Sequence, residues 1–274
     1  YIDTAMVSTL GTHATAAVGS TGTVNWLIES TISAIGIGFL YMISQSIGAN
    51  KILQAKKAAS QAVFSTVLIG IFFTVLTCSC SRLVPIWMQV DPDIQDMASR
   101  YFLILYSPML FRTMNIILGT VLRSAGDAKS PMIAGISMNI INIILNFFLI
   151  YDTRMLQIGT VAFQIPGAGW GIEGAATASA ISYTCGGLMI TWKLWHHNVI
   201  SPKGQSLRPD FQILKPCLRV AFPNMMQRFA TSLGYVAFAS MINSLGEIST
   251  AAHTIANTVE SAFYIPGWGM QTAA

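Results

Sequence analysis

Long stretches without a charged residue alternate with short polar segments along this chain. No Asp, Glu, Lys or Arg occurs in 4–28, 30–50, 58–81, 130–151 or 174–192, and each of these stretches has between 19 and 25 residues. A helix crosses the hydrocarbon core of a bilayer with about 20 predominantly apolar residues. The pattern therefore predicts an all-α polytopic membrane protein.

Charge gaps and turn residues divide the chain into eight hydrophobic segments. We expect a turn at Ser124–Asp127 and a Gly/Pro-rich connection at Gln164–Gly169, because Gly and Pro interrupt helices. The segments cover about 1–10, 14–46, 58–80, 98–121, 131–151, 170–194 and 213–243, and a last one follows Gly246. We expect the first and last segments to be cut short, so that the sequence covers part of a longer protein.

Composition supports a membrane protein and excludes several other classes. Charged residues make up 9% of the chain, whereas soluble domains average about 25%. The net charge is +4, but the basic residues lie between segments and form no basic patch, which argues against a nucleic-acid partner. The sequence contains no CxxC pair, P-loop or HExxH motif. We therefore expect neither an enzyme nor a cofactor, and any pumping must use an ion gradient.

Basic residues are distributed unequally between the two sets of connecting loops. Ten lie in one set and three in the other. Cytoplasmic loops carry the excess of Lys and Arg in membrane proteins. The set with ten, which includes the polar linker 196–212, is therefore expected to face the cytoplasm, and Arg112 and Arg228 remain inside predicted spans.

A weak internal repeat predicts two related halves. A shift of 235 residues aligns 6–24 with 241–259, and 8 of the 19 positions are identical. Chance similarity between apolar helices is the alternative, but the shared Leu-Gly turn and Thr-Ala-Ala helix start favour a true repeat. Six spans separate the copies, so the halves would be parallel six-helix repeats. We expect a first lobe over 1–195, a linker over 196–212 and the start of a second lobe over 213–274.

The acids expected inside spans are Asp3, Glu29 and Glu260. Such groups cost roughly 2.5–3.5 kcal/mol each on insertion scales, and they usually face a cavity or a partner. The carboxylate of Asp3 can bind H⁺ or Na⁺, and its occupancy could be coupled to lobe rotation. The alternative is a carboxylate near the interface that has no ligand.

Three amides share one face of the fifth segment. Asn139, Asn142 and Asn146 follow at i, i+3 and i+7, a spacing that places all three on the same side of a helix. They could hold helices together through hydrogen bonds or supply carbonyl oxygens to a hard cation. The sequence leaves these two alternatives even. Ser179 and Ser182 on the sixth segment are likewise three residues apart, and small hydroxyls of this kind more often pack between helices than act as ligands.

Other polar positions could face a cavity between the lobes. In the repeat Glu260 aligns with Asn25, and Glu29 lies one turn beyond Asn25. Together with Gln227 in the seventh segment, these residues are candidates for contact with a substrate. The alternative for the two acids is an ion pair with one of the arginines inside the spans.

Several motifs resemble those of one transporter family. Asp3-Thr-Ala-Met-Val, with Leu10-Gly11 and Ala16-Ala17-Val18-Gly19 after it, resembles the first-helix signature of the multidrug and toxic compound extrusion (MATE) family. Further similar motifs follow in the expected order along the chain: Ser44-Gln45, Leu122-Arg123, Gly126-Asp127, Gly174–Ser179 and Ile265-Pro266-Gly267. Each motif is short, but the set is specific.

The resemblance implies a twelve-helix, two-lobe exporter in the cell membrane that expels cationic or amphipathic compounds in exchange for Na⁺ or H⁺. It also implies that Asp3, Asn142, Asn146 and Ser179 form the cation site of the first lobe. Many members of the family have an aspartate where this chain has Asn146, and some have a seventh-helix carboxylate that this chain lacks. Glu260 could take over part of the latter role.

We therefore predict a MATE-type antiporter that works as a monomer in the lipid bilayer on small organic cations. Two alternatives stay open. A lipid-linked-oligosaccharide flippase of the same superfamily would need several cationic residues along its cavity, and a channel or a non-transporting scaffold would not need a titratable Asp3.

Overall fold

The computed structural model describes residues 6–7, 9–10, 12–87, 92–158 and 161–243, together with 256, 260, 263–264, 266–267 and 269–270. The chain divides into one compact unit of Tyr1–Met225 and a second unit of Met226–Ala274. The helices and strands that carry the candidate site belong to the first unit.

Long helices form where the charge-free segments predict them. In the order of the chain, the described helices are α2 (Thr12–Gly48), α3 (Ile52–Cys80), α4 (Leu83–Trp87), α5 (Pro92–Tyr106), α6 (Met109–Ser124), α7 (Lys129–Leu149), α8 (Gly171–Trp195) and α9 (Phe211–Asn243). The fold class predicted from sequence is confirmed. The first and last predicted segments lie largely outside the described residues, and the repeat and the two-lobe division stay predictions.

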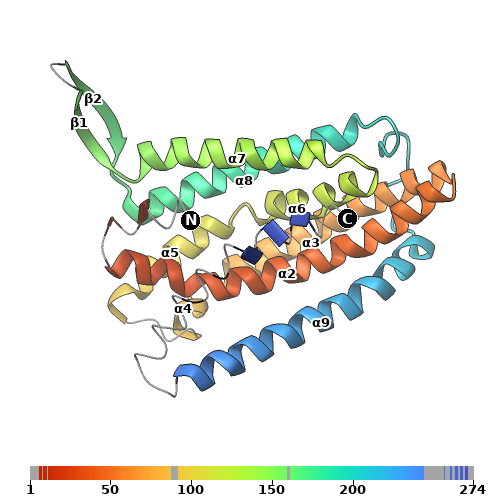
Figure 1. The fold of residues 1–274 in the computed structure, drawn as a ribbon, viewed down its shortest axis with the longest axis horizontal. Helices are drawn as coiled ribbons and strands as arrows, with labels where there is room; N and C mark the ends of the chain where they lie inside the picture. The colour runs from red at the N-terminus through yellow and green to blue at the C-terminus, as the bar shows by residue number, and fades with distance from the viewer. Residues whose placement is uncertain are drawn as a thin grey trace. The chain divides into compact units, whose positions relative to one another are not determined.

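Helix α6 has a central place in the first unit. It packs against α2, α3, α7 and α8, and α7 and α8 lie side by side along their length (Figure 1). Its residues Ile117, Leu118, Val121 and Leu122 are almost completely buried. A helix with neighbours on several sides must be apolar or paired over most of its surface, and the one arginine in its first turn, Arg112, is paired, as described below.

The fourth predicted segment is not one continuous helix. It is divided into α5 and α6, which meet at a bend of 49° with Ser107 and Pro108 between them. Proline has no N–H to donate and disfavours helical geometry in the residue before it. The Ser107 hydroxyl donates to the Ile104 carbonyl at 2.9 Å, so a side chain at the break satisfies one of the carbonyl groups at the end of α5.

The connection before α8 is longer and more regular than predicted. Strands β1 (Asp152–Ile158) and β2 (Val161–Ala168) pair antiparallel and form a hairpin beside the end of α7 (Figure 1). The expected Gly/Pro-rich segment forms the end of β2. The hairpin adds two short strands to an otherwise helical chain.

Several helices meet the length and apolarity of a membrane span. They are α3, α7 and the Leu27–Gly48 part of α2, and the bent α5–α6 pair would be a fourth. Helix α8 is rich in Gly, Ala, Ser and Thr, and α9 contains three basic residues. Both form at nearly the predicted bounds but do not reach the same apolarity. The chain is a multi-pass membrane protein.

The turn between α6 and α7 depends on a glycine and an aspartate. Gly126 has a φ of +85°, which L-residues with a side chain rarely adopt. Asp127 accepts a hydrogen bond from the Ser130 backbone N–H at 2.9 Å and so caps the start of α7. Burial alone would raise the pKa of Asp127, but the hydrogen bonds from Ser130 and the charges of His197 and Lys193 lower it below its usual value.

This lowered pKa predicts a pH-dependent contribution to stability. The carboxylate stabilises the fold fully above the ordinary Asp pKa of about 3.9, and this stabilisation is lost as the pH falls through the lower pKa of the folded protein. We expect Asp127→Ala to cost about 1 kcal/mol at pH 7 and nothing at a pH below both values. Melting temperatures of the two proteins over this range would measure the effect. Asp127→Asn keeps the acceptor without the charge, and its melting temperature should lack this added pH dependence.

Candidate functional site

A chain of side-chain hydrogen bonds connects α7 to α8. The Asn146 side-chain amide donates to Asn142 Oδ1 at 3.1 Å, and the Asn142 amide donates to the Ser179 hydroxyl at 3.0 Å. Asn146 and Ser179 are buried. The family resemblance implied a common site for these three residues. Their side chains are hydrogen-bonded to one another, and their role as cation ligands stays a prediction.

The third amide of the predicted set does not join this chain of hydrogen bonds. Asn139 lies on α7 but is exposed, and it is not one of the two amides that the family resemblance assigns to the cation site. Asn142 and Asn146 differ from Asn139 because their side-chain amides belong to the chain of hydrogen bonds that ends at Ser179. The difference makes Asn139 a natural control for experiments on the other two.

The amide–hydroxyl chain offers oxygen ligands without a full negative charge. Amide carbonyl oxygens and hydroxyl oxygens can both ligate hard cations such as Na⁺, and a carboxylate would add the charge that tight binding needs. The predicted source of that charge, Asp3, lies outside the described residues. The geometry of the described part therefore provides the neutral half of a candidate cation site.

A buried ion pair lies between α2 and α6. Arg112 Nη2 is 2.6 Å and Nε is 3.2 Å from Glu29 Oε1. The two side chains differ in burial, because 4% of the Arg112 side chain and 39% of the Glu29 side chain are exposed. Of the alternatives that the sequence left open for the acids inside spans, the ion pair with Arg112 is the one that Glu29 forms.

Two tyrosines complete the surroundings of Arg112. The guanidinium carbon lies 4.6 Å from the Tyr183 ring centroid and 5.6 Å from the Tyr106 ring centroid. These distances allow cation–π attraction. The Tyr106 hydroxyl donates to Asn25 Oδ1 at 2.8 Å, so the candidate Asn25 belongs to the same polar cluster as Glu29. Sequence reasoning missed both tyrosines, because nothing in their spacing marks them as neighbours of an arginine on another helix.

The remaining candidates lie in the second unit. Gln227 is exposed on α9, and its backbone carbonyl accepts a hydrogen bond from the Thr231 hydroxyl. Glu260 is helical and exposed. Their part in a cavity between the lobes stays a prediction.

Comparison with known proteins identifies the family of this chain. The model of the MatE family matches residues 1–148, which is more than half of the chain. The chain belongs to the MatE family. The MatE match covers α2 to α7 almost completely, and it therefore includes Glu29, Arg112, Asn142 and Asn146.

Other MatE relatives are similar over nearly all of this chain. It is 27% identical over 271 residues to the "Probable multidrug resistance protein NorM" of Thermotoga maritima, covering 99% of this chain and 56% of that protein. It is 28% identical over 261 residues to the "Probable multidrug resistance protein YoeA" of Bacillus subtilis, covering 94% and 54%. The chain thus spans about half the length of the curated relatives that it matches.

Solved structures show the MatE fold as well. A crystal structure of MATE in the bent conformation superposes with a TM-score of 0.87 at 25% identity, covering 99% of this chain and 58% of the other. A transporter of the MOP superfamily from Pyrococcus furiosus has a TM-score of 0.86 at 25% identity, covering 99% and 57%. That protein is described as having a binding pocket of reverse polarity that suggests a different function. A shared fold therefore does not by itself decide the substrate.

Proposed function

We propose that this chain forms part of a secondary active multidrug exporter, which expels cationic or amphipathic organic compounds in exchange for Na⁺ or H⁺. Membership of the MatE family and the names of the relatives support a transporter rather than an enzyme. The hydrogen-bonded chain Asn146–Asn142–Ser179 is the observation that carries the proposal. It supplies three neutral side chains at one place between two helices, where an ion could be held.

In the proposed mechanism, the carboxylate of Asp3 binds the coupling cation. Asn142, Asn146 and Ser179 act as neutral ligands or orient the ones that touch the ion. Binding of the cation changes the balance between outward-facing and inward-facing arrangements, because a ligand shifts an equilibrium toward the state that it binds better. Substrate and cation then compete for one arrangement of the lobes.

We propose further that Glu29, Asn25, Gln227 and Glu260 face the path of the substrate. For Glu29 the support is that 39% of its side chain is exposed, since a partly accessible carboxylate can attract an organic cation. Its partner Arg112 is almost completely covered, so the positive charge itself is not offered to a substrate.

The same burial argues against the flippase alternative. A lipid-linked oligosaccharide carries phosphate groups, and its recognition would require accessible cationic side chains. Arg112 is 4% exposed and hydrogen-bonded to Glu29. A substrate phosphate could reach this guanidinium only by displacing that carboxylate and uncovering the side chain.

Efflux measurements on the full-length protein test the coupling proposal. We expect Asn142→Ala to raise the half-saturating concentration of the coupling ion about tenfold, because the loss of one ligand worth about 1.4 kcal/mol corresponds to that factor. Asp3→Asn should abolish ion-dependent ethidium efflux from proteoliposomes with imposed Na⁺ or H⁺ gradients. Asn139→Ala, an exposed amide three residues before Asn142, is the matched control and should leave the ion dependence unchanged.

Two results would contradict the proposal. One is an Asp3→Asn variant with normal efflux and normal ion dependence, which would favour a channel or a scaffold. The other is an equal effect of Asn142→Ala and Asn139→Ala, because the site distinguishes these residues by position and not by chemistry.

A further inference from the structure

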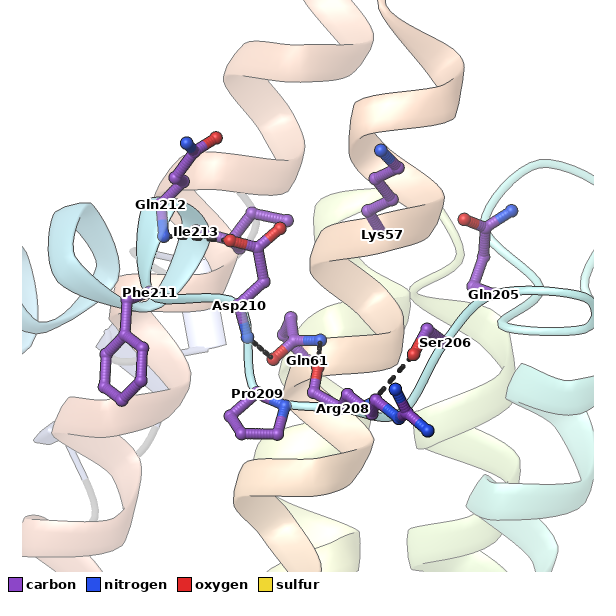
Figure 2. A pocket seen from close by; sticks show the side chains of 10 residues that line it. All are labelled: Lys57, Gln61, Gln205, Ser206, Arg208, Pro209, Asp210, Phe211, Gln212 and Ile213. Carbon is purple, nitrogen blue, oxygen red and sulfur yellow. Dashed lines mark hydrogen bonds between the residues drawn. The ribbon is translucent and has the colours of Figure 1, made fainter.

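A polar pocket lies between α3 and the linker that precedes α9. It has a volume of about 500 Å³ and is bordered by the linker, the first turn of α9 and one face of α3 (Figure 2). The polar residues that matter for its chemistry are Lys57, Gln61, Gln205, Ser206, Arg208 and Asp210. Neither the candidate cation site nor the Glu29–Arg112 pair shares a residue with this pocket.

The linker is fastened to α3 at the floor of the pocket. The Gln61 side-chain amide donates to the Arg208 carbonyl at 2.7 Å, and Gln61 Oε1 accepts the Asp210 backbone N–H at 3.0 Å (Figure 2). The Ser60 hydroxyl donates to the Ser206 carbonyl at 2.8 Å. Because Gln61 is only 3% exposed, its amide is committed to these bonds, and the pocket has a fixed wall.

The charges at the pocket favour an anion. Lys57 lies one turn before Gln61 on the same face of α3, and Arg208 comes from the linker on the other side of Gln61 (Figure 2). Both are exposed, and among the described residues neither is paired with a carboxylate. Asp210 is the one acid of the lining, and its Oδ1 accepts the Gln212 backbone N–H at 2.9 Å as a cap of α9.

The position of the pocket along the chain places it at headgroup depth. Lys57 is the last charged residue before the charge-free run 58–81, which forms most of the α3 span. Phe211, which lines the pocket, is 76% exposed, and Leu207, the linker residue before Arg208, is exposed as well. Basic side chains that lie directly beside exposed apolar ones at the end of a span match the boundary between lipid headgroups and acyl chains.

We propose that this pocket binds the phosphate of an anionic phospholipid headgroup in the leaflet that we expect to be cytoplasmic. Lys57 and Arg208 would contact the phosphate oxygens, Gln205 and Ser206 would contact the glycerol hydroxyls, and Phe211 with Leu207 would cover the start of the acyl chains. The lipid then strengthens the attachment of the linker to α3, since it binds residues of both. This inference does not depend on the proposed export activity.

The test uses the full-length protein in detergent and the lipid phosphatidylglycerol. We expect phosphatidylglycerol to raise the melting temperature of the wild type, whereas phosphatidylcholine should not. The variant Lys57→Gln/Arg208→Gln should bind phosphatidylglycerol about thirtyfold more weakly, because each cation near a membrane surface contributes a factor of roughly five. The matched control Lys51→Gln/Lys215→Gln removes the same charge from exposed positions outside the lining and should keep the wild-type response.

The outcomes separate the possible sources of the anion. Equal weakening in the two double variants would overturn the proposal, because general surface charge would then explain the response. Inorganic phosphate or glycerol 1-phosphate giving the full shift would overturn the assignment to a lipid. If the pocket variant does not accumulate, the single variants Lys57→Gln and Arg208→Gln take its place, each with an expected fivefold weakening, and an unchanged affinity in both would also overturn the proposal.

Discussion

Replacing Glu29 by leucine is expected to lower the free energy of unfolding of the full-length protein by about 3 kcal/mol. The substitution leaves the Arg112 guanidinium buried without its carboxylate, and breaking a buried pair from one side typically costs about 3–5 kcal/mol. The lower end is expected here, because the rings of Tyr183 and Tyr106 continue to face the cation. Unfolding by a denaturing detergent in mixed micelles would measure the loss.

The chain contains a well-matched control for this prediction. Glu173 is 44% exposed and lies 3.7 Å from Arg100, whose side chain is 63% exposed. The two glutamates are therefore similarly accessible, but Arg100 is exposed, lies farther from its glutamate and keeps a second partner, Asp96, at 3.0 Å. Glu173→Leu should cost at most about 1 kcal/mol, as is usual for surface pairs.

A second substitution tests the physical cause. Adding Arg112→Met to Glu29→Leu removes the unpaired charge, and we expect this double variant to recover more than half of the lost stability, because buried ion pairs are often replaceable by apolar side chains. A double variant less stable than Glu29→Leu alone would contradict the explanation. So would equal losses for Glu29→Leu and Glu173→Leu.

Gly187→Ala is expected to destabilise the protein by about 1–3 kcal/mol. A Cβ atom at this position of α8 would lie 2.5 Å from the Phe111 carbonyl oxygen and 2.9 Å from its Cα. Because these are backbone atoms of α6, the clash can be relieved only if α6 and α8 move apart. Overpacking of this kind typically costs about 1–3 kcal/mol. Phe111 directly precedes Arg112, so separation would also disturb the contact of the guanidinium with Tyr183.

The neighbouring glycine gives the comparison. A Cβ atom at Gly186 would meet the Sδ and Cγ atoms of Met138 and, at 3.0 Å, Nδ2 of Asn115, all of which are side-chain atoms and not backbone. Met138 can move at low cost, and alanine favours a helix over glycine by up to about 1 kcal/mol. Gly186→Ala should therefore change stability by less than about 1 kcal/mol. Melting temperatures of the two variants would decide, and a larger loss at Gly186 than at Gly187 would contradict the helix-contact argument.

Much of the helical architecture could be predicted from the sequence, because the bilayer imposes a strong length rule on apolar segments. The charge gaps gave α2, α3, α7, α8 and α9 within a few residues at nearly all of their described ends. The α5–α6 break was missed, although Pro108 was visible inside the predicted span. The scarcity of charged residues defines that span, and this criterion does not respond to a proline within an apolar stretch.

The hairpin and the polar contacts show a different limit. The hairpin sequence has few charges and resembles an ordinary loop. Its two strands are too short for their alternating pattern to predict them. On α7 the spacing placed the three amides on one face of the helix, but it could not show which of them bond to one another and to Ser179 of α8. For Glu29 the two arginines inside the predicted spans are the possible partners, and only the packing of α2 against α6 decides between them.

The attachment of the linker by Gln61 has a consequence for how this segment can change. The two bonds of Gln61 engage only main-chain groups of Arg208 and Asp210, and the bond from Ser60 likewise engages the main chain of Ser206. The attachment of the linker to α3 therefore does not depend on which side chains the linker has at these three positions. It depends on the side chains of Ser60 and Gln61 on α3, so the attachment is encoded in the helix and not in the linker.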